Sequence, residues 1–343
     1  MIIDCHGHYT TTPPQVGAYR DKQKEQVRKD PAFIGEKGQI IISDDDIRES
    51  IMNNQLRLQQ ERGTDLTIFS PRASWMGHHI GNEHTSQYWT EHQNDLIRRV
   101  CDLFPDNFVP VAQLPQSPGV DPAKSVPEMI RTVEEMGFIG INLNPDPSGG
   151  HWHGSALSDR SFYPIYEKMV EYDIPAMVHV SAACNECFHT TGSHYLGADT
   201  TAFQQLMMSD VFKDFPELKI IIPHGGGAVP YHWGRFRGLA QDQGFDLEER
   251  VLNNIFFDTC VYHQKGIDLL LDVIPTRNIL FASEMIGAVR GVDPETGHYF
   301  DDTKRYIDAN QLLSPEQKQA IFEHNTLNVF SRLKAQLAKN SGV

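Results

Sequence analysis

Eight short apolar runs, separated by longer segments of helical periodicity, are the feature of this sequence that most restricts its fold. Strand and helix patterns that alternate along a chain are typical of βα units, and such units build parallel sheets. Eight units predict an α/β fold, a closed (β/α)8 TIM-like barrel. An open doubly wound sheet is the alternative, but no glycine-rich dinucleotide fingerprint follows the first run. The runs are Met1–Cys5, Leu66–Ser70, Phe108–Leu114, Phe138–Leu143, Ala176–Val180, Ile220–Pro223, Ile255–Thr259 and Ile279–Ala282.

The chain of 343 residues is predicted to form a single domain over residues 1–343. Its hydrophobic content of 40% is ample for one large core, and it has no internal repeat or linker-like stretch. Two connections are too long for simple barrel turns, an inserted helical segment at residues 9–65 and an active-site loop at residues 181–202. Long ordered connections usually carry function, and the loops after barrel strands build the site.

Two helices have ends that can be read from the sequence. Ser43, followed by three aspartates, is expected to cap a helical segment that stops at Gly63. Ser314 and Gln317 form a capping-box pattern with a proline at the first helical position. The sequence therefore predicts a packing helix near the C-terminus, with only residues 340–343 left to fray.

Charge and cysteine content limit the kinds of partner and the cellular compartment that we expect for this protein. A net charge of −15 without any basic run argues against a nucleic-acid partner. Five scattered cysteines do not suggest a disulfide framework, and no secretory signal is visible at the N-terminus. No apolar stretch approaches the roughly 20 residues that span a bilayer. We therefore expect a reduced, cytoplasmic protein without a membrane partner.

The first strand carries the sequence DCHGH at residues 4–8. Because side chains alternate between the two faces of a strand, His6 and His8 point the same way. Two imidazoles on one face suit a metal ion, although a polar pair at a strand end is the simpler interpretation of this stretch alone. The residues at the ends of other strands decide between these two interpretations.

Three further strands end in side chains of the same kind. His179 ends the fifth strand, His224 ends the sixth, and Glu284 ends the eighth. His224 precedes three glycines, which allow the backbone to pass close to the pocket. The barrel thus gathers histidines and one carboxylate at the carboxyl ends of four strands, with His224 either a ligand or a partner of one.

Three imidazoles and one carboxylate suit zinc, which accepts nitrogen and oxygen ligands and keeps a position open in catalytic sites. The predicted ligands of one Zn²⁺ per subunit are His6, His8, His179 and Glu284. Manganese or iron accepts the same ligands. Asp258, on the seventh strand, is expected to hydrogen-bond one of them.

This ligand pattern resembles the amidohydrolase superfamily. The PHGGG box and the C-terminal helix with Asn325 look like its decarboxylase-and-hydratase branch, and the stretches SPRAS, IPHGGGAVPYHWGRFRGLAQ and FASEMIGAVRG are similar to its hydratases. The wider superfamily has aspartate where this chain has Glu284. The resemblance implies a metal-dependent hydro-lyase that adds water to the conjugated double bond of a tricarboxylic keto acid in protocatechuate or gallate meta-cleavage.

Hydration of a conjugated double bond needs a base for water and an acid for the neighbouring carbon. Glu284 is expected to combine the roles of ligand and base. The candidate acids are His224, Cys187, Tyr195 and His194, and the sequence does not choose among them. A redox role for the CNEC stretch that contains Cys187 is the alternative interpretation of that thiol.

The carboxylates of such a substrate need partners in the pocket. Arg72, just past the second strand, stands where a bidentate clamp is expected, and Arg290 and Arg235 are further candidates. Asn142 and Asn144 alternate at the end of the fourth strand, so both are expected to face the pocket.

Two alternative functions stay open at this point. One is a decarboxylase or lactone hydrolase of the same fold that acts on a related carboxylate of aromatic catabolism. The other is a metalloprotein without catalytic activity. Because exposed barrel helices often mediate association, we also expect a homo-oligomer, a dimer or higher.

Overall fold

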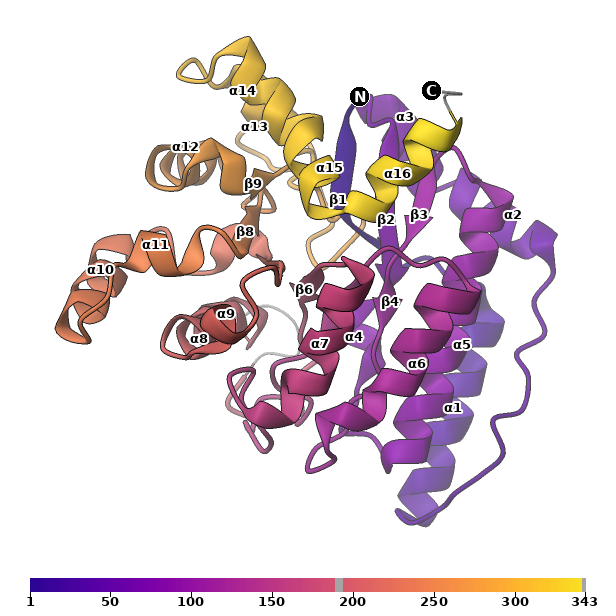
Figure 1. The fold of residues 1–343 in the computed structure, drawn as a ribbon. Helices are drawn as coiled ribbons and strands as arrows, with labels where there is room; N and C mark the ends of the chain where they lie inside the picture. The colour runs from indigo at the N-terminus through magenta and orange to yellow at the C-terminus, as the bar shows by residue number, and fades with distance from the viewer. Residues whose placement is uncertain (189–193, 341–343) are drawn as a thin grey trace.

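The structure is a computed structural model that describes residues 1–188 and 194–340. Its strands are short, and every neighbouring pair is parallel. They lie in the orders β1-β2-β3 and β4-β5-β6-β7-β8-β9 around the centre of the molecule (Figure 1). The strands are β1 (Ile3–Tyr9), β2 (Leu66–Pro71), β3 (Phe108–Pro110), β4 (Ala112–Gln113), β5 (Ile141–Leu143), β6 (Ala176–Val178), β7 (Ile220–Ile222), β8 (Ile255–Asp258) and β9 (Ile279–Leu280).

The third predicted strand is divided into β3 and β4 at Val111. Its two parts pair on opposite sides: the Val111 amide donates to Phe69 O at 2.9 Å, and the Ala112 amide donates to Gly140 O at 3.0 Å. One strand position thus links the two sheets.

Two backbone hydrogen bonds close the barrel on the other side. The Cys5 amide donates to Phe281 O at 2.9 Å, and the Glu284 amide donates to His6 O at 3.0 Å. The segment that follows β9 therefore lies beside β1. The predicted (β/α)8 architecture is confirmed.

Helices cover the outside of the strands, with α1, α5 and α6 on one flank and α10 to α12 on the other (Figure 1). Because helices cover the outer face of the strands and side chains of the other strands fill the barrel interior, every residue of β1 is buried. The longer helices are α1 (Pro14–Lys29), α2 (Asp44–Met52), α3 (Gln55–Arg62), α5 (Glu83–Leu103), α7 (Tyr163–Tyr172), α8 (His194–Met207), α10 (Trp233–Asp242), α12 (Gln264–Val273), α13 (Lys304–Ala309) and α16 (Ser331–Asn340). The shorter ones are α4 (Ala73–Met76), α6 (Val126–Ile130), α9 (Val211–Asp214), α11 (Leu247–Val251), α14 (Pro315–Gln319) and α15 (Asn325–Val329). None of the described helices is long and apolar enough to cross a bilayer.

The inserted segment after β1 is helical, as predicted, and consists of α1, α2 and α3. Ser43 and Asp46 form a reciprocal capping box at the start of α2. Gly63, with a φ of 69°, ends α3 in the left-handed conformation that glycine adopts without strain. The helical segment predicted between Ser43 and Gly63 is divided into α2 and α3, because the chain turns at Asn53 and Asn54.

The connection after β6 is shorter than the predicted loop of residues 181–202, because α8 begins at His194. Ala198, Ala202 and Leu206 recur every four residues and are fully buried, which is the pattern of a helix packed on the barrel. Residues 189–193 lie outside the described residues.

The C-terminal helices pack on the barrel, as predicted. Ser314 and Gln317 form the expected capping box. The Asn325 amide donates to Thr276 O at 2.7 Å and to Ile279 O at 2.8 Å, which ties α15 to the start of β9. The last three residues, 341–343, lie outside the described part of the chain.

Candidate metal centre

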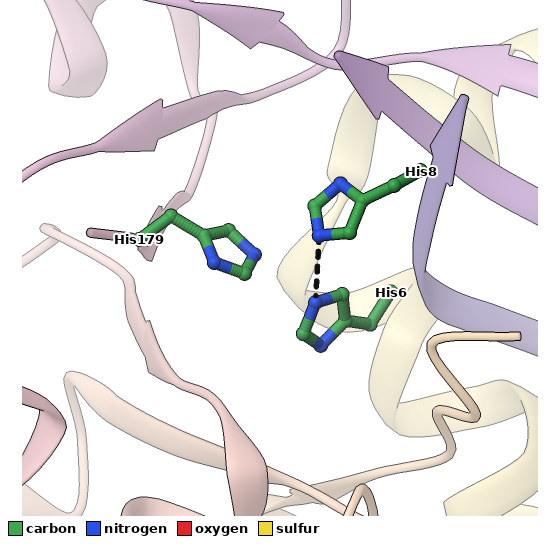
Figure 2. Close-up of side chains that lie close together, drawn as sticks. All are labelled: His6, His8 and His179. Atoms are coloured by element: carbon green, nitrogen blue, oxygen red, sulfur yellow. Dashed lines mark hydrogen bonds between the residues drawn. The ribbon is translucent and has the colours of Figure 1, made fainter. Parts of the chain in front are cut away.

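Three buried histidines from two strand ends converge inside the barrel mouth (Figure 2). His6 Nε2 lies 3.1 Å from His8 Nε2, and the candidate ligand atoms of His6, His8 and His179 all lie within 4.8 Å of one another. His179 Nε2 is buried without a hydrogen-bond partner among the described residues. The arrangement leaves several ring nitrogens directed at one small region.

These nitrogens fit a divalent cation. Nitrogen ligands at about 2.0–2.1 Å from a tetrahedral zinc lie roughly 3.3 Å apart, close to the observed separation of His6 Nε2 and His8 Nε2. Burial, followed by the neighbouring histidines, lowers the pKa of His8 and of His179 well below the ordinary value. Both rings are therefore neutral near pH 7, the state in which imidazole binds a metal.

The outer nitrogens of His6 and His8 have different partners. His6 Nδ1 lies 2.7 Å from Asp258 Oδ2, which is the hydrogen bond that the sequence predicts for Asp258. His8 Nδ1 lies 2.8 Å from Ser70 Oγ. Such partners fix the ring orientation and the tautomer of a metal ligand.

Glu284 and His224 stand beside this cluster. The ligand atoms of His6, His224 and Glu284 also lie within 4.8 Å of one another, and His224 Nε2 is 3.8 Å from Glu284 Oε2. Glu284 and His224 have φ angles of 49° and 53°. For residues other than glycine this conformation is uncommon, and it clusters at functional sites.

His224 is held by a residue that the sequence did not single out. Asp199 Oδ2 on α8 lies 2.8 Å from His224 Nδ1. Burial alone lowers the pKa of His224, but the carboxylates of Asp199, Glu284 and Asp258 outweigh it and raise the pKa to about 9. The ring is thereby oriented with Nε2 toward Glu284.

The first glycine after His224 is required by close packing against Val261. Gly225 has a φ of 64°, and a Cβ there would lie 2.4 Å from Val261 Cγ2. Its amide donates to Asp258 Oδ1 at 2.9 Å, so this turn also holds the carboxylate that faces His6.

A cavity of about 130 Å³, open to solvent, connects these groups to the rim of the barrel. His8, His179, His224 and Glu284 line one end, and two arginines line the other. The charged and aromatic lining residues are His8, Arg72, His179, His194, Tyr195, His224, Glu284 and Arg290.

The two arginines at the cavity have no carboxylate partner among the described residues. Arg72 is half-buried, donates from Nε to Ser74 Oγ at 3.0 Å and stacks on Trp75. Burial, followed by the charge of Arg290, lowers the pKa of Arg72. Two neighbouring guanidinium groups without an anion form an electrostatically unsaturated site that suits a carboxylate.

Tyr195 and His194 lie in the cavity wall among the candidate acids. The ring of Tyr195 is 4.4 Å from that of His224. Burial, followed by the charge of Glu284, raises the pKa of Tyr195 to about 12, so its hydroxyl stays protonated. His194 is buried, with Nε2 3.6 Å from Asp146 Oδ2.

Four of the predicted catalytic and substrate-binding residues do not line this cavity. Cys187 is exposed on the loop after β6, and Arg235 is exposed on α10. Asn144 is buried, 3.5 Å from Ser181 Oγ. Asn142 lies inside the barrel and donates to Ser70 Oγ at 3.0 Å.

Three residues of the site escaped the sequence reasoning, namely Ser70, Asp199 and Tyr262. Ser70 is the last residue of the second apolar run, so its strand-end position was an available signal. The Tyr262 hydroxyl donates to Glu284 Oε2 at 3.2 Å. Asp199 lies within a helix and has no local signal, because its role depends on how α8 packs.

The chain belongs to the amidohydrolase family. The family model described as Amidohydrolase matches residues 3–332, nearly the whole chain. A 5-carboxyvanillate decarboxylase from Novosphingobium aromaticivorans, solved with bound manganese, superposes with a TM-score of 0.70 at 18% identity, covering 96% of this chain and 97% of that one. At this identity the likeness shows the fold alone.

Within the family, the chain is similar to hydratases over its full length. It is 58% identical over 339 residues, 98% of either chain, to the 2-keto-4-carboxy-3-hexenedioate hydratase of a Sphingobium species. The crystal structure of 4-oxalomesaconate hydratase from Rhodopseudomonas palustris superposes with a TM-score of 0.91 at 58% identity and covers 100% of this chain and 99% of that one. The gamma-resorcylate decarboxylase of a Polaromonas species is 28% identical over 54% of this chain and 59% of its own length.

Proposed function

We propose that this protein is a metal-dependent hydratase that adds water to the conjugated double bond of 4-oxalomesaconate or its 3-hexenedioate isomer. The product is 4-carboxy-4-hydroxy-2-oxoadipate, an intermediate of protocatechuate and gallate meta-cleavage. The 58% identity to two hydratases along the whole chain supports this assignment. The single observation that carries it is a cavity with a histidine–carboxylate cluster at one end and two unpaired arginines at the other.

The substrate chemistry matches these two ends. In a 2-keto-3-hexenedioate the carbonyl is conjugated with the double bond, so hydroxide adds to the far carbon, C4, and a proton adds to C3. The addition makes one C–O and one C–H bond from one water and expels nothing. The enzyme therefore needs a base, an acid and partners for three carboxylates.

The chain supplies each of these roles from the cavity wall. Glu284 takes the proton of the attacking water, and its Oε2 lies 3.2 Å from the Tyr262 hydroxyl and 3.8 Å from His224 Nε2. His224, oriented by Asp199, delivers the proton to C3, and Tyr195 lies against its ring. Arg72 and Arg290 bind substrate carboxylates through their guanidinium groups.

His6, His8 and His179 would hold the divalent cation, with Glu284 as the fourth ligand. When bound, such a cation lowers the pKa of water from 15.7 to about 7 and so supplies hydroxide at neutral pH. We propose zinc, one per chain, because three imidazoles and a carboxylate are a zinc-type donor set.

The Glu284→Gln variant tests the proposal, because it keeps the size of the side chain and removes the base. We expect the fall in substrate ultraviolet absorbance to slow by about 10²–10⁴-fold, the usual contribution of a general base. Mass spectrometry of the wild-type product should show the addition of one water. The exposed Glu248→Gln variant serves as the matched control and should keep the wild-type rate.

Two results would contradict this function. Release of carbon dioxide in place of water addition would assign the protein to the decarboxylases that also resemble it. Turnover of Glu284→Gln at the wild-type rate would remove Glu284 from the reaction.

Three further expectations accompany the hydratase proposal. They are zinc in preference to manganese or iron, a homo-oligomer, and a cytoplasmic location. Elemental analysis, light scattering and cell fractionation test them separately.

A further inference from the structure

Beneath the histidine cluster, a buried hydrogen-bond chain runs from His8 through Ser70 to Asn142. Ser70 Oγ is 2.8 Å from His8 Nδ1, receives the Asn142 amide at 3.0 Å and donates to Gly7 O at 3.2 Å. His8, Ser70 and Asn142 are between 2% and 4% exposed. Asn142 borders a small internal cavity below the cluster and does not reach the substrate cavity.

The direction of each hydrogen bond between His8, Ser70 and Asn142 depends on which group supplies the proton. A serine hydroxyl has one proton and two lone pairs. The Asn142 amide occupies one lone pair, and the hydroxyl faces two backbone acceptors, Gly7 O at 3.2 Å and Pro71 O at 3.4 Å. When the hydroxyl proton goes to either of them, the second lone pair accepts a hydrogen bond from His8 Nδ1, and the proton of a neutral His8 then lies on Nδ1. His8 Nε2 is then unprotonated and faces His6 Nε2.

Asp258 does the same for His6 by a different means. A carboxylate only accepts, so it holds the proton of His6 on Nδ1 whatever its surroundings. A hydroxyl can accept or donate, and it therefore needs a second group to fix its direction. Asn142 is that group for Ser70.

We propose that Ser70 and Asn142 are positioning residues that fix the tautomer and orientation of His8, and that Asn142 is not a substrate contact. This inference rests on the proposed metal site. It assigns different hydrogen-bond partners to the two histidines of the first strand. The carboxylate of Asp258 fixes the tautomer of His6 alone, whereas the neutral Ser70 needs Asn142 as a second group to fix the tautomer of His8.

The test measures zinc affinity, by competition with a chromophoric chelator, in wild type, Ser70→Ala, Asn142→Leu and the double variant. We expect Ser70→Ala to bind zinc about 10–100-fold more weakly, the usual effect of losing a ligand's partner. Because Asn142 acts through Ser70, its variant should lose less, and the double variant should bind no more weakly than Ser70→Ala. Ser70→Thr, which keeps the hydroxyl, should retain most of the affinity.

Gln113→Leu is the matched control. Gln113 is a buried amide on β4, paired in register with Asn142, and its Oε1 has no partner among the described residues. Its replacement should leave zinc affinity within about two-fold of wild type, because it does not touch His8. A second readout is the ¹⁵N spectrum of the histidine rings in the metal-free protein, where Ser70→Ala should reduce the Nδ1–H form of His8.

The outcomes separate this inference from the proposed function. If wild type binds no zinc, the metal site itself is wrong. If wild type binds zinc tightly and Ser70→Ala binds it equally well, only the positioning role is overturned. If Asn142→Leu raises KM at full metal content, Asn142 is a substrate contact after all.

Discussion

At the histidine end of the cavity, His6 Nδ1 and His8 Nδ1 are each held by a buried hydrogen bond, with Asp258 and Ser70 respectively. At the arginine end, Arg72 and Arg290 each donate one side-chain hydrogen bond to a neutral oxygen, and neither has an ion pair within the described residues. The histidine end is thus preorganised before any ligand arrives. The arginine end keeps its charge unsatisfied and free to meet a carboxylate.

The difference indicates that the two ends of the cavity have different roles. A cation requires its ligands within a few tenths of an ångström, so rigid support around the histidines is needed. A flexible polycarboxylate can change its conformation as it binds, and guanidinium groups on loops can move with it. Changes at the histidine end should therefore affect metal and turnover, whereas changes at the arginine end should affect substrate binding.

The largest effect is expected from His179→Ala, which removes a buried ring nitrogen without a hydrogen-bond partner in the part of the chain that the structure describes. We expect metal content to fall well below that of wild type and turnover to fall by at least about 10³-fold, since activation of water by the cation is lost. Elemental analysis and the absorbance assay measure both. His298→Ala, at an exposed ring, should change neither. Full metal content in His179→Ala would end the assignment of this histidine as a ligand.

An intermediate effect is expected from Arg72→Met at the other end. Loss of a charge-assisted hydrogen bond of about 1.5–3 kcal/mol should reduce kcat/KM by about 10–100-fold, mainly through KM. Metal content should stay at the wild-type level, and the melting temperature should not fall, because repulsion from Arg290 is relieved. Arg72→Lys keeps the charge without the planar fork and should fall between the two. Loss of metal in Arg72→Met would break the division between the two ends.

The histidine end was easier to predict from the sequence than the arginine end, for a physical reason. The alternation of side chains along β1 and the position of His179 and Glu284 at strand ends are local properties, and the barrel brings strand ends together. The structure brings these groups into one cluster with His6 and His8.

How deep a side chain lies in the barrel, and how a helix packs on the barrel, could not be predicted from the sequence in the same way. Alternation predicts that Asn142 and Asn144 share one face, but it does not say that Asn142 lies below the histidines, where it meets Ser70. The pairing of Asp199 with His224 depends on the packing of α8, and Arg235 follows an outward face of α10. The pairing of Asp199 and the exposure of Arg235 both depend on tertiary structure, and residue spacing in the sequence does not predict either.

The smallest effect is expected from Gly287→Ala, which tests the position of Glu284 without touching a histidine. A Cβ at Gly287 would lie 2.6 Å from Glu284 Cδ and 2.6 Å from Glu284 O, so the glutamate side chain must move to make room. We expect kcat to fall by about ten-fold, because a misplaced base transfers protons less well, while metal content stays near wild type.

Gly197→Ala, in α8, is the control, since nothing lies within 4 Å of its added Cβ. It should retain wild-type kcat and gain slightly in stability, because alanine favours the helix. If Gly287→Ala lost its metal together with its activity, three histidines without a correctly placed Glu284 would not retain the cation, and the loss of activity would reflect the loss of metal.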